Sequence, residues 1–145
     1  MSPFPDFKNL KSNRDSYPSS DPETLVQSSK LDKIVVTGGK PLNGIIPISG
    51  AKNAALKHMC AALLSDEPIY FENAPNMLRD IQSQCDLLTY LGCQIRREKD
   101  LMAIDAGPVK SQTAPYDIVR KMRGSILVLG PLLARFGQAK VSLPG

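Results

Sequence analysis

The stretch ISGAKNAAL, residues 48–56, carries the strongest local signal in the sequence. A β-branched run leads into a glycine turn, and residues 51–64, rich in Ala, Leu and Met, predict a helix of about four turns capped by Ser49-Gly50. The first helical turn offers free backbone N–H groups and a partial positive charge, to which Lys52 adds a full charge. A cation there becomes favourable when a phosphate or carboxylate docks, and the Asn53 amide can both donate and accept. Lys52 and Asn53 are therefore candidate anion-binding residues, with a solvent-exposed helix start as the alternative.

Two short runs precede this stretch. Residues 33–36 and 44–48 are β-branched and are separated by a turn-rich segment, which predicts a hairpin with Pro47 at a sheet edge. Residues 1–30 contain four prolines and seven serines without sustained periodicity. Such a segment buries too little apolar area to offset its ordering entropy, so we expect a disordered N-terminal extension.

The elements after the first helix follow a regular order. Residues 68–72 predict a strand, and apolar residues at helical spacing over 78–88 predict a helix, with Asn76 as its N-cap and Gly92 as its C-terminal stop. Residues 93–105 predict a second hairpin. The order is therefore helix, strand, helix, strand, strand.

The same order begins again near the C-terminus. A helix is predicted over 115–129, Gly130-Pro131 is expected to break or kink it, and a short helical piece and a strand at 140–143 follow. The pattern indicates an α/β (α+β) fold with about one and a half repeat units.

Composition narrows the function classes. The 145 residues suit one domain, and the 42% of hydrophobic residues supply enough material for a core. A net charge of +4 suits an anionic small molecule but lacks the dense basic clusters of a DNA-binding protein. The sequence has no run of about 18 apolar residues, so no membrane span is expected. We therefore expect a cytoplasmic protein without a nucleic-acid or membrane partner.

A second basic group lies in the predicted helix near the C-terminus. Arg120, Lys121 and Arg123 are close in sequence, and the two arginines are expected on one helix face. Guanidinium groups bind phosphate through two parallel hydrogen bonds, so this group is a candidate phosphate site. A solvated basic face is the alternative.

Residues that could carry metal or nucleophilic chemistry are few. The single histidine, His58, lies in an otherwise apolar helix and is expected to be packed or half-exposed rather than catalytic. Cys60, Cys85 and Cys93 have no CxxC spacing, and we expect reduced thiols, with Cys60 and Cys85 inert in the core. The sequence therefore predicts no metal site.

Two long segments resemble a known enzyme family. They are LDKIVVTGGKPLNGIIPISGAKNAALKHMCAALLSDEPIYFENAP, residues 31–75, and APYDIVRKMRGSILVLGPLLARFGQAKVSLPG, residues 114–145. Residues 31–145 resemble the N-terminal third of the UDP-N-acetylglucosamine 1-carboxyvinyltransferases, which are enolpyruvyl transferases. The resemblance implies transfer of the enolpyruvyl group of phosphoenolpyruvate to UDP-N-acetylglucosamine with release of phosphate, the first committed step of peptidoglycan synthesis, without a cofactor.

The resemblance also implies roles for residues and segments. Lys52 and Asn53 match the residues that contact phosphoenolpyruvate, and Arg123 matches the residue that contacts UDP-N-acetylglucosamine. The implied fold is two domains of three βαβαββ units each, in which residues 31–50 pack with the second domain and 51–145 form part of the first.

One implied catalytic residue has no counterpart here. The family's proton-donating cysteine or aspartate would lie just beyond Gly145, and none of the three cysteines occupies that position. We therefore expect an N-terminal fragment that is inactive alone and has no catalytic residue of its own. A basic RNA-binding module of related repeat fold and a non-functional remnant are the alternatives; stacking groups for RNA would be Tyr90, Tyr116 and Phe136.

Overall fold

The computed structural model describes residues 34–120 and 122–143. The predicted extension 1–30 and the residues Lys121 and Gly145 lie outside this described part. In chain order its helices and strands are α1 Lys52–Ala61, the 3₁₀ helix η2 Ala62–Leu64, β1 Ile69–Phe71, α2 Arg79–Leu91, β2 Gln94–Glu98, β3 Leu101–Asp105, β4 Thr113–Ala114, α3 Tyr116–Val119, the 3₁₀ helix η3 Arg123–Val128, α4 Leu129–Phe136 and β5 Lys140–Val141.

Three strands form an antiparallel sheet in the order β1-β3-β2. Ile104 of β3 pairs with Ile69 on one side and Ile95 on the other. Because side chains alternate along a strand, these three isoleucines share one face of the sheet. A separate parallel pair joins β4 to β5.

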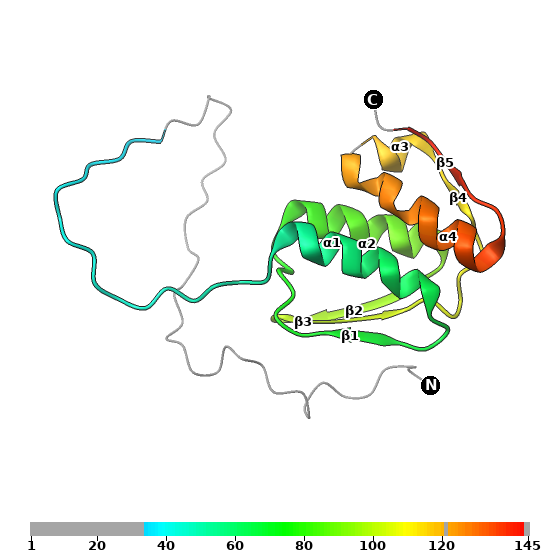
Figure 1. Ribbon diagram of the computed structural model, residues 1–145, viewed down its shortest axis with the longest axis horizontal. Helices are drawn as coiled ribbons and strands as arrows, with labels where there is room; N and C mark the ends of the chain where they lie inside the picture. Colours follow the sequence, from blue (N-terminus) through cyan, green and yellow to red (C-terminus); the bar gives the residue numbers. More distant parts are fainter. Residues whose placement is uncertain (1–33, 121, 144–145) are drawn as a thin grey trace.

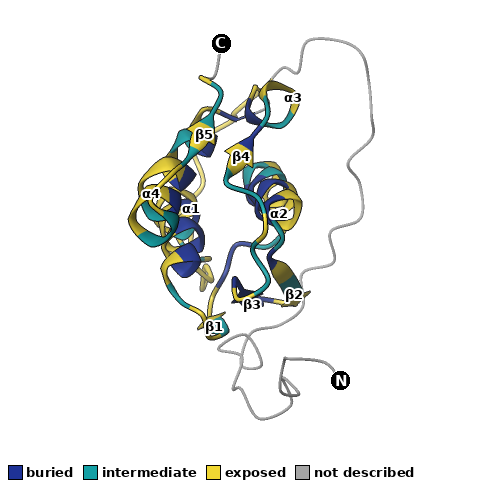
Figure 2. Ribbon diagram, turned by 90° about the vertical axis from the view of Figure 1, so that its right-hand side faces the viewer, coloured by how far each residue is buried: buried dark blue, intermediate teal, exposed yellow. Residues whose placement is uncertain are grey.

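The helices cover the sheet and enclose the core. In Figure 1, α1 and α2 lie side by side over the three-stranded sheet, with α4 beside them and the β4–β5 pair at the far end. Figure 2 shows the buried residues on the sides of α1 and α2 that face the middle of the molecule. Burial of each large apolar side chain stabilises the fold by about 1.5–3 kcal/mol. The largest fully buried side chains include Met59, Leu63, Ile81, Leu87, Leu88, Leu91, Met102, Ile104 and Leu132.

The α/β (α+β) fold class and the element order over residues 51–105 are confirmed. The helix predicted over 51–64 is α1 followed by η2, and the strand at 68–72 and the hairpin at 93–105 both form. Gly92 ends α2 in the left-handed conformation, with φ of 112°. An added Cβ there would lie 2.9 Å from the Pro108 carbonyl oxygen, so both backbone and space require glycine.

Both predicted N-caps are wrong. The helix α1 begins after Ala51 and α2 begins after Leu78, and neither has a side-chain cap. Asn76 instead donates its Nδ2–H to the carbonyl oxygens of Lys99 and Leu101, at 3.0 and 2.9 Å. The Asn76 amide therefore binds the turn between β2 and β3. The capping prediction was wrong because it considers only neighbours in sequence and not this contact from a distant turn.

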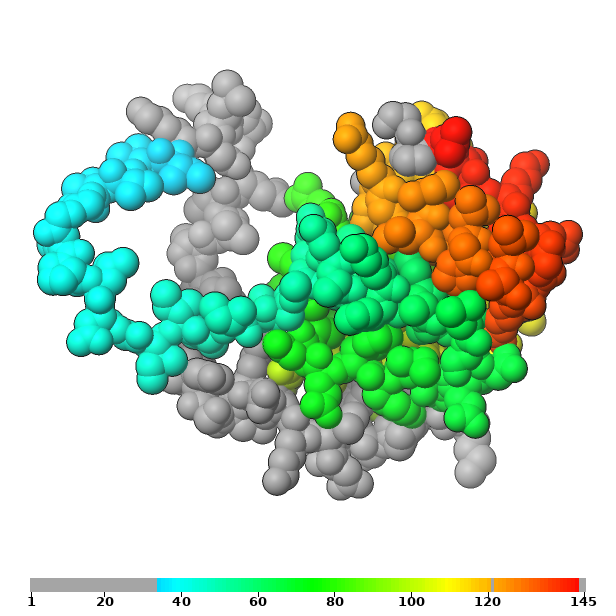
Figure 3. Space-filling model, viewed as in Figure 1, coloured from blue at the N-terminus to red at the C-terminus, as the bar shows by residue number. Residues whose placement is uncertain are grey.

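The predicted hairpin before α1 is also wrong for the described residues. Residues 34–49 are exposed and form neither a helix nor a strand. Figures 1 and 3 show this segment as an arc that leaves the body of the molecule at α1. A strand needs a neighbour to satisfy its backbone N–H and C=O groups, and none of the described strands pairs with this segment.

The helix predicted over 115–129 is interrupted earlier than expected. After α3, Met122 is extended, with φ of −154° and ψ of 122°, and η3 then runs directly into α4. Pro131 does not break the helix, because it is the third residue of α4 and its missing N–H would have no partner within that helix. The sequence prediction also missed β4, a strand of two residues.

Candidate functional site

The turn before α1 is fixed by a close backbone contact. A Cβ added to Gly50 would lie 2.1 Å from the carbonyl oxygen of Asn73, so a larger residue cannot occupy this position without a shift. Asn73 itself has a positive φ of 53°. The first turn of α1 contains no acidic residue and has no side-chain cap. Its orphan N–H groups are therefore available to an anion.

Lys52 is held at this turn by an ion pair with α2. Its Nζ lies 2.7 Å from Oδ2 of Asp80, and the two side chains are 46% and 39% exposed. Asp80 lies in the first turn of α2, where a carboxylate is favoured by the helix dipole. An exposed pair of this kind contributes about 0–1 kcal/mol to stability, so the geometry serves positioning more than folding.

A cavity of about 480 Å³ lies between α1, α2 and the start of η3. On the α1 side it is lined by Asn53, Leu56 and Lys57, whose spacing places them on one helix face. The carboxylate of Asp80 lines it from α2. The remaining wall is formed by Met122, Arg123, Gly124 and Leu127.

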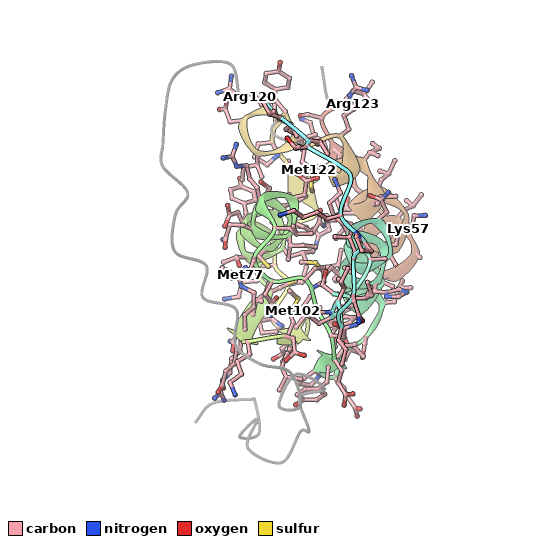
Figure 4. The ribbon with its side chains drawn as sticks, turned by 90° about the vertical axis from the view of Figure 1, so that its left-hand side faces the viewer. Lys57, Met77, Met102, Arg120, Met122 and Arg123 are labelled. Carbon is pink, nitrogen blue, oxygen red and sulfur yellow. The ribbon has the colours of Figure 1, made fainter. Side chains whose placement is uncertain are left out.

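The structure brings Arg123 to the site but not Arg120. The two arginines are not on one helix face, because the chain is extended at Met122 between α3 and η3. Arg120 pairs with Asp117, Nε to Oδ1 at 3.7 Å, and does not line the cavity. Figure 4, which looks at the end of the molecule where α1 begins, shows both arginines at the top, Arg120 to the left and Arg123 to the right. Lys121 lies outside the described residues.

The three cysteines are free and buried, which confirms Cys60 and Cys85 as core thiols and places Cys93 in the core as well. Burial raises the pKa of Cys60 to about 12, that of Cys85 to about 11 and that of Cys93 to about 12. The Cys60 sulfur accepts a hydrogen bond from Nε2 of the buried Gln84 at 3.1 Å. Thiols in this setting are poor nucleophiles and poor proton donors at neutral pH.

His58 lies on the exposed side of α1, away from the cavity that Arg123 lines. It borders a smaller hollow of about 190 Å³ together with Glu72 and Asn73. Among the described residues no group of three or more His, Cys, Asp or Glu side chains could hold a metal ion. None of the described helices is long and apolar enough to cross a membrane.

Sequence reasoning missed the structural role of Arg135. Its Nη1 donates to the carbonyl oxygens of Leu63, Ser65 and Ala106 at 2.9, 3.1 and 3.0 Å, and its Nη2 pairs with Asp66. Leu63 lies in η2, Ser65 directly follows η2 and Ala106 directly follows β3, so Arg135 ties α4 to both elements. Because η3 is continuous with α4, this contact also fixes the wall of the cavity that carries Arg123.

Sequence reasoning also missed Asp80 and Lys57 at the site. Lys57 follows Asn53 by four residues, and this helical spacing could have found it. Asp80 comes from a different helix, so its place beside Lys52 depends on the packing of α1 against α2. No local signal in the sequence indicates that packing.

Comparison with known proteins places this arrangement in a family. A family model described as EPSP synthase (3-phosphoshikimate 1-carboxyvinyltransferase) matches residues 36–145. The chain belongs to this family. The match includes the three candidate residues Lys52, Asn53 and Arg123.

Several relatives in the family share more than half of the aligned residues. Proteins named UDP-N-acetylglucosamine 1-carboxyvinyltransferase from Jannaschia sp. (strain CCS1) and Ruegeria pomeroyi are 57% and 56% identical over 117 residues, 79% of this chain. The relative of the same name from Sorangium cellulosum is 53% identical over 115 residues. The chain spans only 27–28% of the length of these relatives.

A solved structure of an enolpyruvyl transferase has a similar fold. The enolpyruvyl transferase NikO from Streptomyces tendae superposes with a TM-score of 0.62 at 25% sequence identity. The match covers 70% of this chain and 24% of that protein. Both comparisons therefore describe this chain as similar to one part of a longer enzyme.

Proposed function

We propose that this chain is the substrate-binding part of an enzyme that transfers the enolpyruvyl group of phosphoenolpyruvate to UDP-N-acetylglucosamine and releases phosphate. The observation that carries the proposal is the cavity, which joins the start of α1 to Arg123 although they are distant in sequence. The names of the relatives support the same reaction. The proposed setting is peptidoglycan synthesis in the cytoplasm, which contributes to cell shape and cell division.

Each candidate residue has a chemical task in this proposal. Phosphoenolpyruvate carries a phosphate and a carboxylate, and Lys52 together with the uncapped N–H groups of α1 suits such an anion. Asn53 can accept from a hydroxyl and donate to an acyl or phosphate oxygen. The fork of Arg123 suits the diphosphate of the nucleotide sugar.

The same groups would stabilise the reaction as charge develops. Phosphate leaves with negative charge, and preorganised cations beside the leaving group lower the barrier without reorganising during the step. The reaction also needs a proton for the vinyl carbon of phosphoenolpyruvate. The described cysteines are buried and do not line the cavity, so we infer that the proton donor lies outside the described residues. The 145 residues alone are then expected to bind substrate without turnover.

The exposed segment before α1, residues 34–48, is expected to pack against another part of the same enzyme. Residues 34–48 expose seven large apolar side chains, among them Ile34, Leu42 and Ile46, which are 80–97% exposed. Exposed apolar runs of this length mark surfaces that another element covers. We propose that residues 31–50 pack with a second domain and that residues 51–145 form part of the first.

An activity assay on the protein isolated from its own cells tests the proposal. The enzyme of which this chain is the proposed substrate-binding part should release phosphate from phosphoenolpyruvate only when UDP-N-acetylglucosamine is present, whereas the 145 residues alone should not release it. Substitution Lys52→Ala should lower kcat/KM by about 100-fold, the usual effect of removing one preorganised charge partner. The matched control Lys110→Ala removes an exposed lysine away from the cavity and should leave the rate unchanged. Substrate-independent phosphate release, or an unchanged rate in Lys52→Ala, would overturn the proposal.

A further inference from the structure

Lys57 lines the cavity and is positively charged, but the proposed function gives this residue no role. It lies on α1 with Asn53 and Leu56, and all three line the cavity from the same helix face. Its side chain is exposed. Lys57 makes no ion pair with any residue that the structure describes.

Arg123 lines the same cavity from η3, also without an ion pair among the described residues. Figure 4 shows Arg123 at the top of the molecule and Lys57 at its right-hand edge, on the wall that α1 forms. Two cations that line one cavity repel each other, and a multiply charged anion between them removes that repulsion. The cavity is therefore more favourable when it holds an anion than when it is empty.

The charge of the site specifies the class of anion. Lys57 and Arg123 supply two positive charges to the lining, and Asp80 is the single carboxylate among the described lining residues; Lys52 does not line the cavity but pairs with Asp80. Because Asp80 is paired with Lys52, Lys57 and Arg123 remain uncompensated. A net charge of plus two matches a phosphate ester or a diphosphate better than a monoanion.

We propose that Lys57 is a further substrate-binding residue, which contacts a phosphate group of the ligand from the wall of the cavity that α1 forms. This inference rests on the proposed function, because both proposed substrates carry such a group. Phosphoenolpyruvate supplies a phosphate ester and UDP-N-acetylglucosamine supplies a diphosphate.

Calorimetric titration of the 145-residue chain tests the role of Lys57. Wild type, Lys57→Ala, Lys57→Arg and Lys110→Ala are titrated with phosphoenolpyruvate, UDP-N-acetylglucosamine and inorganic pyrophosphate at low and high salt. We expect Lys57→Ala to weaken binding of at least one substrate by about 3- to 10-fold at low salt, the range for one partly exposed charge contact. Lys57→Arg should retain the affinity, and the loss should shrink at high salt because salt screens the contact. The melting temperatures should match, since Lys57 is exposed.

The pattern of losses identifies the ligand group. A loss for UDP-N-acetylglucosamine alone assigns Lys57 to the diphosphate, and a loss for phosphoenolpyruvate alone assigns it to the phosphate ester. Equal affinities of wild type and Lys57→Ala for every ligand, or an equal loss in Lys110→Ala, would overturn the inference. Binding of pyrophosphate but of neither substrate, with a loss in Lys57→Ala, would support Lys57 as an anion ligand and refute the proposed function. No binding of any of the three ligands by wild type would overturn the inference.

Discussion

At the scale of single residues, Gly50 sets the position of the whole site. The Asn73 carbonyl oxygen lies where a side chain at residue 50 would begin, because a Cβ on Gly50 would approach that oxygen to 2.1 Å. A backbone oxygen cannot rotate away as a flexible side chain can. The close contact therefore fixes where α1 begins and where Lys52 and Asn53 lie.

Substitution Gly50→Ala should destabilise the fold by about 1–3 kcal/mol, because the added methyl group forces the turn apart. Urea unfolding of wild type and variant measures the difference. Gly44→Ala is the matched control, since a Cβ at Gly44 meets no atom within 4 Å. Equal midpoints for Gly50→Ala and Gly44→Ala would show that the close contact does not constrain the turn.

The buried thiols make stability depend on alkaline pH. The folded protein holds the pKa of Cys60 at about 12 and that of Cys85 at about 11, above the ordinary thiol value of 9.0. Above pH 9.0 the thiols of the unfolded chain lose protons that the same thiols keep in the folded chain. The contribution of these thiols to stability is therefore full below pH 9 and falls as the pH rises toward their folded pKa values. Urea midpoints should fall between pH 8 and pH 10.5, and the fall should be smaller in Cys60→Ala. An equal fall in wild type and Cys60→Ala would contradict burial of this thiol.

At the scale of elements, α4 carries the wall that holds Arg123. Its proline lies in the first turn, where the backbone N–H has no partner within the helix, while Ala134 is exposed in the helix interior. Proline should therefore be tolerated at position 131 and should destabilise the helix at position 134.

Replacement Pro131→Ala should change the free energy of unfolding by less than about 1 kcal/mol, whereas Ala134→Pro should cost about 3 kcal/mol or more. The second change removes a helical hydrogen bond and crowds the preceding turn. Thermal unfolding of both variants measures the contrast. A large loss in Pro131→Ala with little loss in Ala134→Pro would place the start of α4 elsewhere.

Local patterns predicted those elements whose stabilising partners are near in sequence. The apolar spacing of α2, the stop at Gly92 and the β2–β3 hairpin were all evident from the residues. The strands predicted before α1 did not form because a strand depends on a neighbour that no local pattern provides. The break at Met122 was missed because the apolar spacing continues across it, and a proline further on was a stronger signal.

At the scale of the whole molecule, the site depends on packing between distant segments. The start of α1 was predicted as an anion site from the sequence alone, through Lys52 and Asn53. Residue spacing predicted Arg123 as a separate basic group with Arg120, and the family resemblance linked it to the nucleotide sugar; the fold shows that it lines a cavity together with Asn53. Lys57 follows Asn53 at helical spacing, whereas the place of Asp80 in the site depends on the packing of α1 against α2.

The central claim is that the start of α1 and the start of η3 form one substrate site. The most direct test is an NMR titration of the ¹⁵N-labelled 145-residue chain with UDP-N-acetylglucosamine and phosphoenolpyruvate, following the backbone amide shifts. We expect the largest changes at residues 51–57 and 123–127 together, and their loss in the double variant Lys52→Ala/Arg123→Ala. Changes confined to other segments, or changes that persist unaltered in the double variant, would contradict a shared site.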